Sequence, residues 1–115
     1  MSHFHAVVWI DHRQANVFHF NADEAEKLTL RAQHTAGEEG YLHGVAQALS
    51  DAGEILITGP SSAKTELMKH IARHDPQLLS RVAGVESADH PTDGQIVAHA
   101  RHYFEATDRK TAQKV

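Results

Sequence analysis

Three short apolar segments open the chain, with polar residues between them. His5–Ile10, HAVVWI, is rich in valine, isoleucine and tryptophan, and residues 15–20, ANVFHF, have the same character, which is typical of β-strands. The four polar residues at 11–14 predict a hairpin turn between them. Residues 27–32, KLTLRA, alternate leucine with polar residues and predict a third strand with one buried face. The chain is therefore expected to begin with an antiparallel meander.

The spacing of apolar residues becomes helical after this meander. Leu42, Val45 and Leu49 fall on one face of a helix. Residues 35–38, TAGE, match a capping box, which places the start of the helix there or nearer Gly40.

The middle of the chain predicts a buried strand followed by a second helix. Residues 55–58, ILIT, form a short continuous apolar run, as a central strand would. Ala63, Leu67 and Ile71 then recur at helical spacing.

The last third predicts a helical turn, an edge strand and a final helix. Asp75 and Pro76 read as an N-cap with proline at the first helical position. Residues 82–86 predict an edge strand, and residues 92–95, TDGQ, match a capping box. The apolar face of the final helix consists of Ile96, Ala100, Tyr103 and Phe104.

The resulting order of elements is βββ-α-β-α-β-α. An antiparallel meander followed by crossover helices implies an α/β fold with a mixed sheet covered by helices. We expect one domain over residues 1–107 and a polar tail over residues 108–115.

Composition and charge narrow the function classes. The 115 residues include no cysteine, which excludes disulfides and thiolate metal sites. The net charge of −4 provides no global basic field for nucleic acid, although eleven histidines can offset it when protonated. The opening lacks the features of a signal peptide, and no apolar run approaches the roughly 20 residues that span a membrane. A cytoplasmic protein without a membrane partner is expected.

One segment, ILITGPSSAKTELMKHI, outlines a phosphate-binding loop but does not satisfy its pattern. The Walker motif needs a glycine, four residues, and then Gly-Lys-Ser/Thr. Here the interval between Gly59 and Lys64 is too short, Ala63 replaces the second glycine, and Pro60 lacks a backbone N–H. An ATP-binding loop is therefore not expected, and no cofactor is assigned.

Five residues are candidates for binding an anion or RNA. Ser61, Ser62 and Lys64 surround a helix N-terminus, which either is simply capped by a serine or holds a phosphate group. His12 and Arg13 occupy the hairpin tip, which either is an ordinary solvated turn or contacts RNA phosphates.

The order of segments resembles the middle domain of the eukaryotic and archaeal class-I translation release factors and of pelota, and more closely the small bacterial proteins built from that domain. The resemblance covers residues 5 to 105 and rests on AVVWIDHRQANVFHF, KLTLRA, ILITGPSSAKTELMKHI and DPQLLSRV. It implies a three-layer, ribonuclease-H-like mixed sheet and a role in translation, with the ribosome or structured RNA as partner.

The chain departs from that family in its chemistry. Release factors carry Gly-Gly-Gln in the loop after the third strand, where it promotes hydrolysis of peptidyl-tRNA. The corresponding residues 32–44, AQHTAGEEGYLHG, lack this tripeptide, and the Asp-Gly-Gln at 93–95 lies after the last strand. No catalytic residue is assigned, and the chain is more consistent with a binding protein than with an enzyme.

Histidines and one aspartate leave alternatives open. His70 and His74 are spaced to share a helix face with Glu66, but a zinc site needs three or four converging ligands and only pairs are visible. The helix macrodipole accounts for His70 and His74 without a metal, so no metal ligand is assigned. Asp11 follows the first strand, as a nuclease carboxylate could, but it also suits a turn that binds its own backbone.

The sequence thus favours a non-catalytic, translation-associated protein that binds the ribosome or structured RNA. One alternative is a protein–protein interaction module or homodimer with no RNA contact. A further alternative is a metal-dependent nuclease of ribonuclease-H-like fold.

Overall fold

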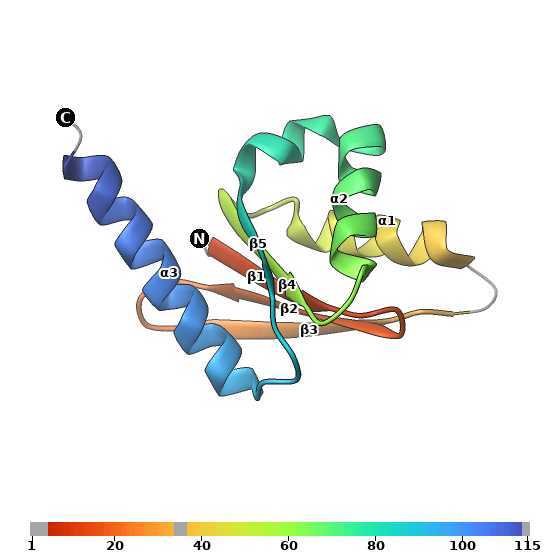
Figure 1. The fold of residues 1–115 in the computed structure, drawn as a ribbon, viewed down its shortest axis with the longest axis horizontal. Helices are drawn as coiled ribbons and strands as arrows, with labels where there is room; N and C mark the ends of the chain where they lie inside the picture. The colour runs from red at the N-terminus through yellow and green to blue at the C-terminus, as the bar shows by residue number, and fades with distance from the viewer. Residues whose placement is uncertain (1–4, 34–36, 114–115) are drawn as a thin grey trace.

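A mixed five-stranded sheet forms the centre of the molecule (Figure 1). The computed structural model describes residues 5–33 and 37–113, with side chains up to residue 107. The strands are β1 (His5–Ile10), β2 (Gln14–Phe20), β3 (Ala25–Arg31), β4 (Glu54–Gly59) and β5 (Val82–Ser87). The helices are α1 (Gly37–Leu49), α2 (Ala63–His74), the 3-10 helix η1 (Pro76–Arg81) and α3 (Asp93–Gln113).

The strands lie in the order β3-β2-β1-β4-β5. β2 pairs antiparallel with β1 and β3, as the predicted meander requires. β4 is parallel to both β1 and β5, because the connections through helices return the chain to the same end of the sheet. β5 lies at one edge, as predicted.

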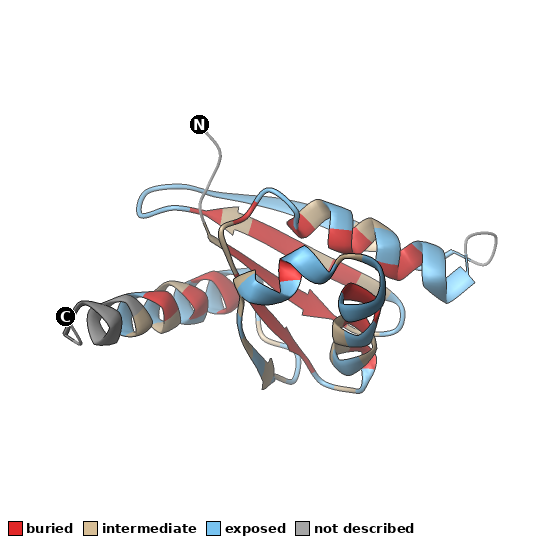
Figure 2. Cartoon of the chain, turned by 90° about the horizontal axis from the view of Figure 1, so that it is seen from above, coloured by how far each residue is buried: buried red, intermediate tan, exposed pale blue. Residues whose placement is uncertain are grey.

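Helices cover both faces of the sheet, and each face has its own apolar cluster (Figures 1 and 2). Successive side chains of a strand point to opposite faces, so β1 supplies Val8 and Ile10 to the cluster under α1 and α2, and Val7 and Trp9 to the cluster under α3. The predicted apolar faces of all three helices are confirmed, with Leu42, Leu67 and Phe104 each buried. The three-layer, ribonuclease-H-like α/β fold expected from the sequence is confirmed.

The third strand lacks the buried face that its alternating leucines predicted. Leu28 is 49% exposed, and only Leu30 packs partly against the cluster under α1 and α2. The reason is position: β3 is an edge strand, and the helices cover the middle of the sheet more completely than this edge.

The stretch that corresponds to the release-factor loop is mostly helical, in agreement with the predicted start of the first helix. α1 begins at Gly37, so residues 37–44 of the segment that corresponds to the release-factor loop form its first turns. Residues 34–36, which contribute to the predicted capping box, lie outside the described residues.

Of the predicted helix N-caps whose residues the structure describes, only the one at α3 forms through side chains. The Thr92 N–H donates to Gln95 Oε1 at 2.9 Å, and the Gln95 N–H donates to Thr92 Oγ1 at 3.2 Å, which completes a capping box. Ser62 and Asp75 occupy the N-cap positions of α2 and η1, and Pro76 begins η1 as predicted, but neither N-cap residue makes a side-chain cap hydrogen bond. Ser62 itself has helical backbone angles, which a capping side chain does not favour.

The C-terminal helix is longer than expected. α3 continues past residue 107 to Gln113. The domain limit at residue 107 stays a prediction.

Candidate functional site

All five candidate residues lie beyond the carboxyl ends of the parallel strands β1 and β4, in the interior of the sheet order. The β1–β2 turn carries His12 and Arg13, and the connection from β4 to α2 carries Ser61 and Ser62. Ligands of open α/β sheets bind beyond the carboxyl ends of their strands. We call this region the strand-end surface and define it by residues 11–14, residues 60–66 and the first turn of α1.

The β1–β2 turn is held rigidly. Asp11 Oδ1 accepts hydrogen bonds from the N–H groups of Arg13 and Gln14, both at 2.8 Å. The Ala32 N–H donates to the Arg13 carbonyl at 2.8 Å, and the Tyr41 hydroxyl donates to the Asp11 carbonyl at 2.9 Å. Burial, followed by the nearby Asp11 charge, raises the pKa of the Tyr41 phenol, so this donor stays protonated. The sequence left two roles open for Asp11, a nuclease carboxylate or a turn residue that binds its own backbone. These hydrogen bonds show the second role.

The turn presents the side chains of His12 and Arg13 outward, in different environments. The side chains of His12 and Arg13 are both exposed. His12 Nε2 lies 3.3 Å from Glu66 Oε1 of α2. Among the described residues, the Arg13 guanidinium makes no hydrogen bond or ion pair. Arg13 is therefore available to bind an external anion, whereas the His12 ring already contacts the Glu66 carboxylate.

The N-terminus of α2 is less open than the sequence suggested. Lys64 Nζ donates to the Ser61 carbonyl at 2.7 Å, so the ammonium group bends back onto its own turn. Ser61 Oγ is buried and has no hydrogen-bond partner in the described part of the chain. Ser62 is exposed. Lys64 would have to leave Ser61 before it could hold a phosphate group.

Two glutamates that the sequence did not single out as anion-site residues line the same surface. Glu38 of α1 and Glu66 of α2 lie next to each other and, with His12, line a cavity of about 280 Å³. The hydrogen bond with Glu66, together with repulsion from its charge, holds the pKa of Glu38 above its usual value, and burial adds to the effect. The His12 charge acts in the opposite direction. This pair could not be predicted locally, since its members lie on different helices.

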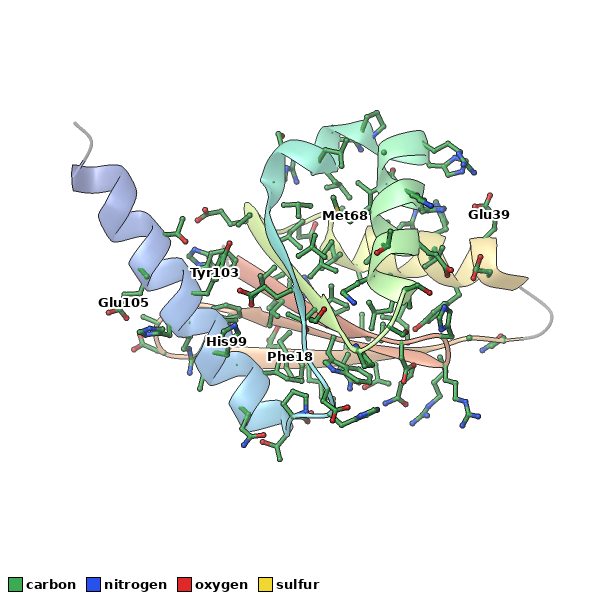
Figure 3. The ribbon with its side chains drawn as sticks, in the orientation of Figure 1. Phe18, Glu39, Met68, His99, Tyr103 and Glu105 are labelled. Atoms are coloured by element: carbon green, nitrogen blue, oxygen red, sulfur yellow. The ribbon has the colours of Figure 1, made fainter. Side chains whose placement is uncertain are left out.

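Three groups of described residues place metal-ligand atoms within 4.8 Å of one another: Glu39, His70 and His74; His43, His70 and Asp75; and His12, Glu38 and Glu66. The expected grouping of Glu66 with His70 and His74 does not occur. Glu66 instead faces α1 and the β1–β2 turn, and Glu39 of α1 takes its place beside the two histidines. Figure 3 shows the Glu39 side chain near the C-terminal turns of α2. Asp11 belongs to none of these groups.

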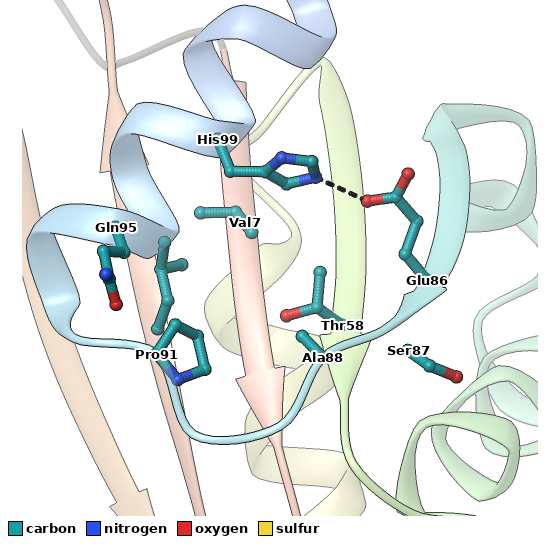
Figure 4. A pocket seen from close by; sticks show the side chains of 9 residues that line it. Val7, Thr58, Glu86, Ser87, Ala88, Pro91, Gln95 and His99 are labelled. Carbon is teal, nitrogen blue, oxygen red and sulfur yellow. Dashed lines mark hydrogen bonds and ion pairs between the residues drawn. The ribbon is translucent and has the colours of Figure 1, made fainter.

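A cavity of about 680 Å³ lies on the face of the sheet that α3 covers, between β5, the first turns of α3 and the loop that joins them (Figure 4). His99 Nε2 lies 2.7 Å from Glu86 Oε1 across it. The buried Thr58 hydroxyl donates to the Val8 carbonyl at 3.1 Å, so its proton is already used. None of the five candidate residues lines this cavity.

In the described part of the chain, no helix combines the length and the apolar character that crossing a bilayer requires.

No family model and no curated protein matches the chain. Solved structures do share its fold. Pelota of Archaeoglobus fulgidus aligns with a TM-score of 0.68 at 13% identity, over 85% of this chain and 30% of that protein. Dom34 of S. cerevisiae, described as a translation termination-like factor involved in RNA quality control pathways and interacting with Hbs1, aligns with a TM-score of 0.60 at 13% identity, over 83% of this chain and 31% of that protein.

An archaeal translation termination factor, aRF1, aligns with a TM-score of 0.50 at 13% identity, over 96% of this chain and 39% of that protein. In each case the chain spans well under half of the relative, so it is similar to one part of these proteins. This chain therefore has the fold that one part of Pelota, Dom34 and aRF1 shares, as its segment order led us to expect.

Proposed function

We propose that the chain is a non-catalytic, translation-associated protein that binds the ribosome or structured RNA through the strand-end surface. The observation that carries this proposal is the fold, which is similar to part of Pelota over 85% of the chain. The absence of Gly-Gly-Gln from the sequence supports a binding role over hydrolysis, and the helical start at Gly37 leaves little loop in which a substitute could lie. A cytoplasmic location follows from such a partner.

Arg13 is the proposed principal contact. Its guanidinium projects from a turn that four hydrogen bonds to backbone atoms hold in place, so little backbone entropy is lost when it binds. A guanidinium can donate two parallel hydrogen bonds to one phosphate. His12, Ser61, Ser62 and Lys64 are proposed to lie around the same phosphate backbone, with Lys64 exchanging the Ser61 carbonyl for a phosphate oxygen.

Co-sedimentation with ribosomes purified from the source cells tests this proposal. The chain should pellet with ribosomes at low salt and dissociate as salt rises, because phosphate contacts release counterions. Arg13→Gln should weaken binding and lower the slope of log K against log salt by about 1. Arg73→Gln, which removes the same charge from an exposed position at the far end of α2, should leave both unchanged. Protein that stays free at low salt, or equal effects of the two variants, would refute the proposal.

The second candidate is a homodimer or protein–protein module without RNA contact. It is favoured by the two sheet edges, where Leu28 of β3 and Val85 of β5 are 49% and 42% exposed. An exposed strand edge can pair with a strand of another molecule. Sedimentation equilibrium should then show a dimer that Leu28→Lys dissociates, while ribosome binding is absent. A monomer at all concentrations would exclude the homodimer.

A further inference from the structure

His70 is a buried histidine whose two ring nitrogens have different surroundings. Its side chain is only 4% exposed. Nδ1 lies 3.2 Å from Glu39 Oε1, within hydrogen-bond distance. Nε2 is buried and has no hydrogen-bond partner among the described residues. Buried polar atoms are rarely left without a partner, because an unpaired buried donor or acceptor loses its hydrogen bonds to water and destabilises the fold.

A second buried atom without a partner lies nearby. Asp75 Oδ2 also lacks a hydrogen bond in the described part of the chain. A nitrogen of His43, a nitrogen of His70 and a carboxylate oxygen of Asp75 all lie within 4.8 Å of one another. His43 comes from α1, His70 from α2, and Asp75 from the junction of α2 with η1, so three segments converge on one point.

The backbone of Asp75 is fixed independently of its side chain. Its N–H donates to the Ile71 carbonyl at 2.8 Å, and its carbonyl accepts from the Leu78 N–H at 2.9 Å. Pro76 follows as the first residue of η1. The Asp75 backbone is therefore held in place at the end of α2, and its carboxylate, which makes no side-chain cap hydrogen bond, lies near His70.

The Glu39 contact determines which His70 nitrogen can bind a cation. A carboxylate accepts the Nδ1 proton of a neutral imidazole, and the lone pair is then on Nε2. Metal-binding histidines usually donate their other N–H to a carboxylate in this way, which fixes the tautomer and the ring orientation. A bare Nε2 and a carboxylate oxygen are both acceptors, so a cation between them would satisfy both.

We propose that His43, His70 and Asp75 form a binding site for a divalent late transition metal, of which Zn²⁺ is the best match. Two imidazoles and one carboxylate suit Zn²⁺, whereas Mg²⁺ and Ca²⁺ prefer oxygen ligands alone. Ligand atoms of a tetrahedral zinc site are about 3.4 Å apart, given bonds of about 2.0–2.2 Å. The side chain of His43 is exposed and can turn inward to close the remaining gap. A water molecule completes the coordination.

The bound metal would join α1, α2 and η1, and so stabilise the layer of helices beside the strand-end surface. This proposal is independent of the proposed role in translation.

Calorimetric titration of the whole chain with Zn²⁺, in a non-coordinating buffer, tests the site. We expect one ion to bind each chain, with a rise in melting temperature that a chelator reverses. His43→Gln and Asp75→Asn should each weaken binding at least tenfold. His74→Gln is the matched control, because it removes an exposed histidine of the same helix that the proposed set does not require, and it should change the affinity less than threefold.

Melting curves without metal show whether each variant is folded, and His43→Gln is the decisive variant because its side chain is exposed. Long-range ¹H–¹⁵N spectra of the imidazoles should show zinc on His70 Nε2 while Nδ1 keeps its proton. The proposal is overturned if no zinc binds, if His43→Gln and Asp75→Asn bind as tightly as the wild type, or if zinc binds through Nδ1. A stoichiometry above one that falls equally with every histidine variant would mean adventitious surface binding and would also overturn it.

Discussion

Gly59 belongs to a segment that resembles a phosphate-binding loop, but packing between strands explains why this residue is a glycine. It ends β4 at the position where a phosphate-binding loop would begin. A Cβ at this position would lie 2.2 Å from the Ile10 carbonyl oxygen of β1. Glycine is thus required by the close approach of two parallel strands, with no need for a nucleotide.

Gly59→Ala should destabilise the protein by about 1–3 kcal/mol, the usual cost of overpacking, because the obstructing atom belongs to the backbone. Gly94→Ala is the control, since a Cβ there meets nothing within 4 Å, and it should be neutral or stabilising by up to about 1 kcal/mol. Urea unfolding monitored by circular dichroism measures both. Equal stability of Gly59→Ala and the wild type would contradict the packing explanation.

At the scale of elements, the starts of α2 and α3 look alike in sequence and differ in structure. Both follow a hydroxyl-bearing residue, Ser62 and Thr92. Thr92 exchanges hydrogen bonds with Gln95, whereas Ser62 makes no side-chain cap bond.

Thr92→Ala should therefore lower the free energy of unfolding by about 1 kcal/mol, the usual value of an N-cap. Ser62→Ala should change it by less than about 0.5 kcal/mol, as an ordinary surface substitution does. Denaturation midpoints of the two variants provide the comparison. A larger loss from Ser62→Ala than from Thr92→Ala would show that the described caps are misassigned.

For the whole molecule, the sheet separates two apolar clusters. Ile57 belongs to the cluster under α1 and α2, and Ile96 to the cluster under α3. Side chains on opposite faces of a sheet share few packing partners, so their contributions to stability should be independent.

Ile57→Val and Ile96→Val should each cost about 0.5–1.5 kcal/mol, and the double variant should cost their sum to within about 0.5 kcal/mol. A double-mutant cycle from equilibrium unfolding measures the difference. An interaction energy well above that limit would mean that the two layers pack as one.

Local patterns in the sequence were sufficient to predict every strand, every helix and the resemblance to the release-factor fold. Strand periodicity was enough to predict His5–Ile10, and helical periodicity was enough to predict the apolar faces of α1, α2 and α3. The capping box at Thr92 spans only residues 92–95. The hairpin turn at Asp11 is equally local. The convergence of the five candidate residues was not predicted, because it follows from the parallel pairing of β1 with β4, whose residues are far apart in the sequence.

Tertiary structure alone decided the exposure of Leu28 and the convergence of His70 with Glu39, His43 and Asp75. The contacts between α1 and α2 join residues about 30 positions apart, as with Glu39 and His70. Sequence periodicity reports which face of an element is apolar, but not which neighbour covers that face. Burial, ion pairing and metal-ligand geometry depend on that neighbour, and so only the packed helices and sheet could determine them.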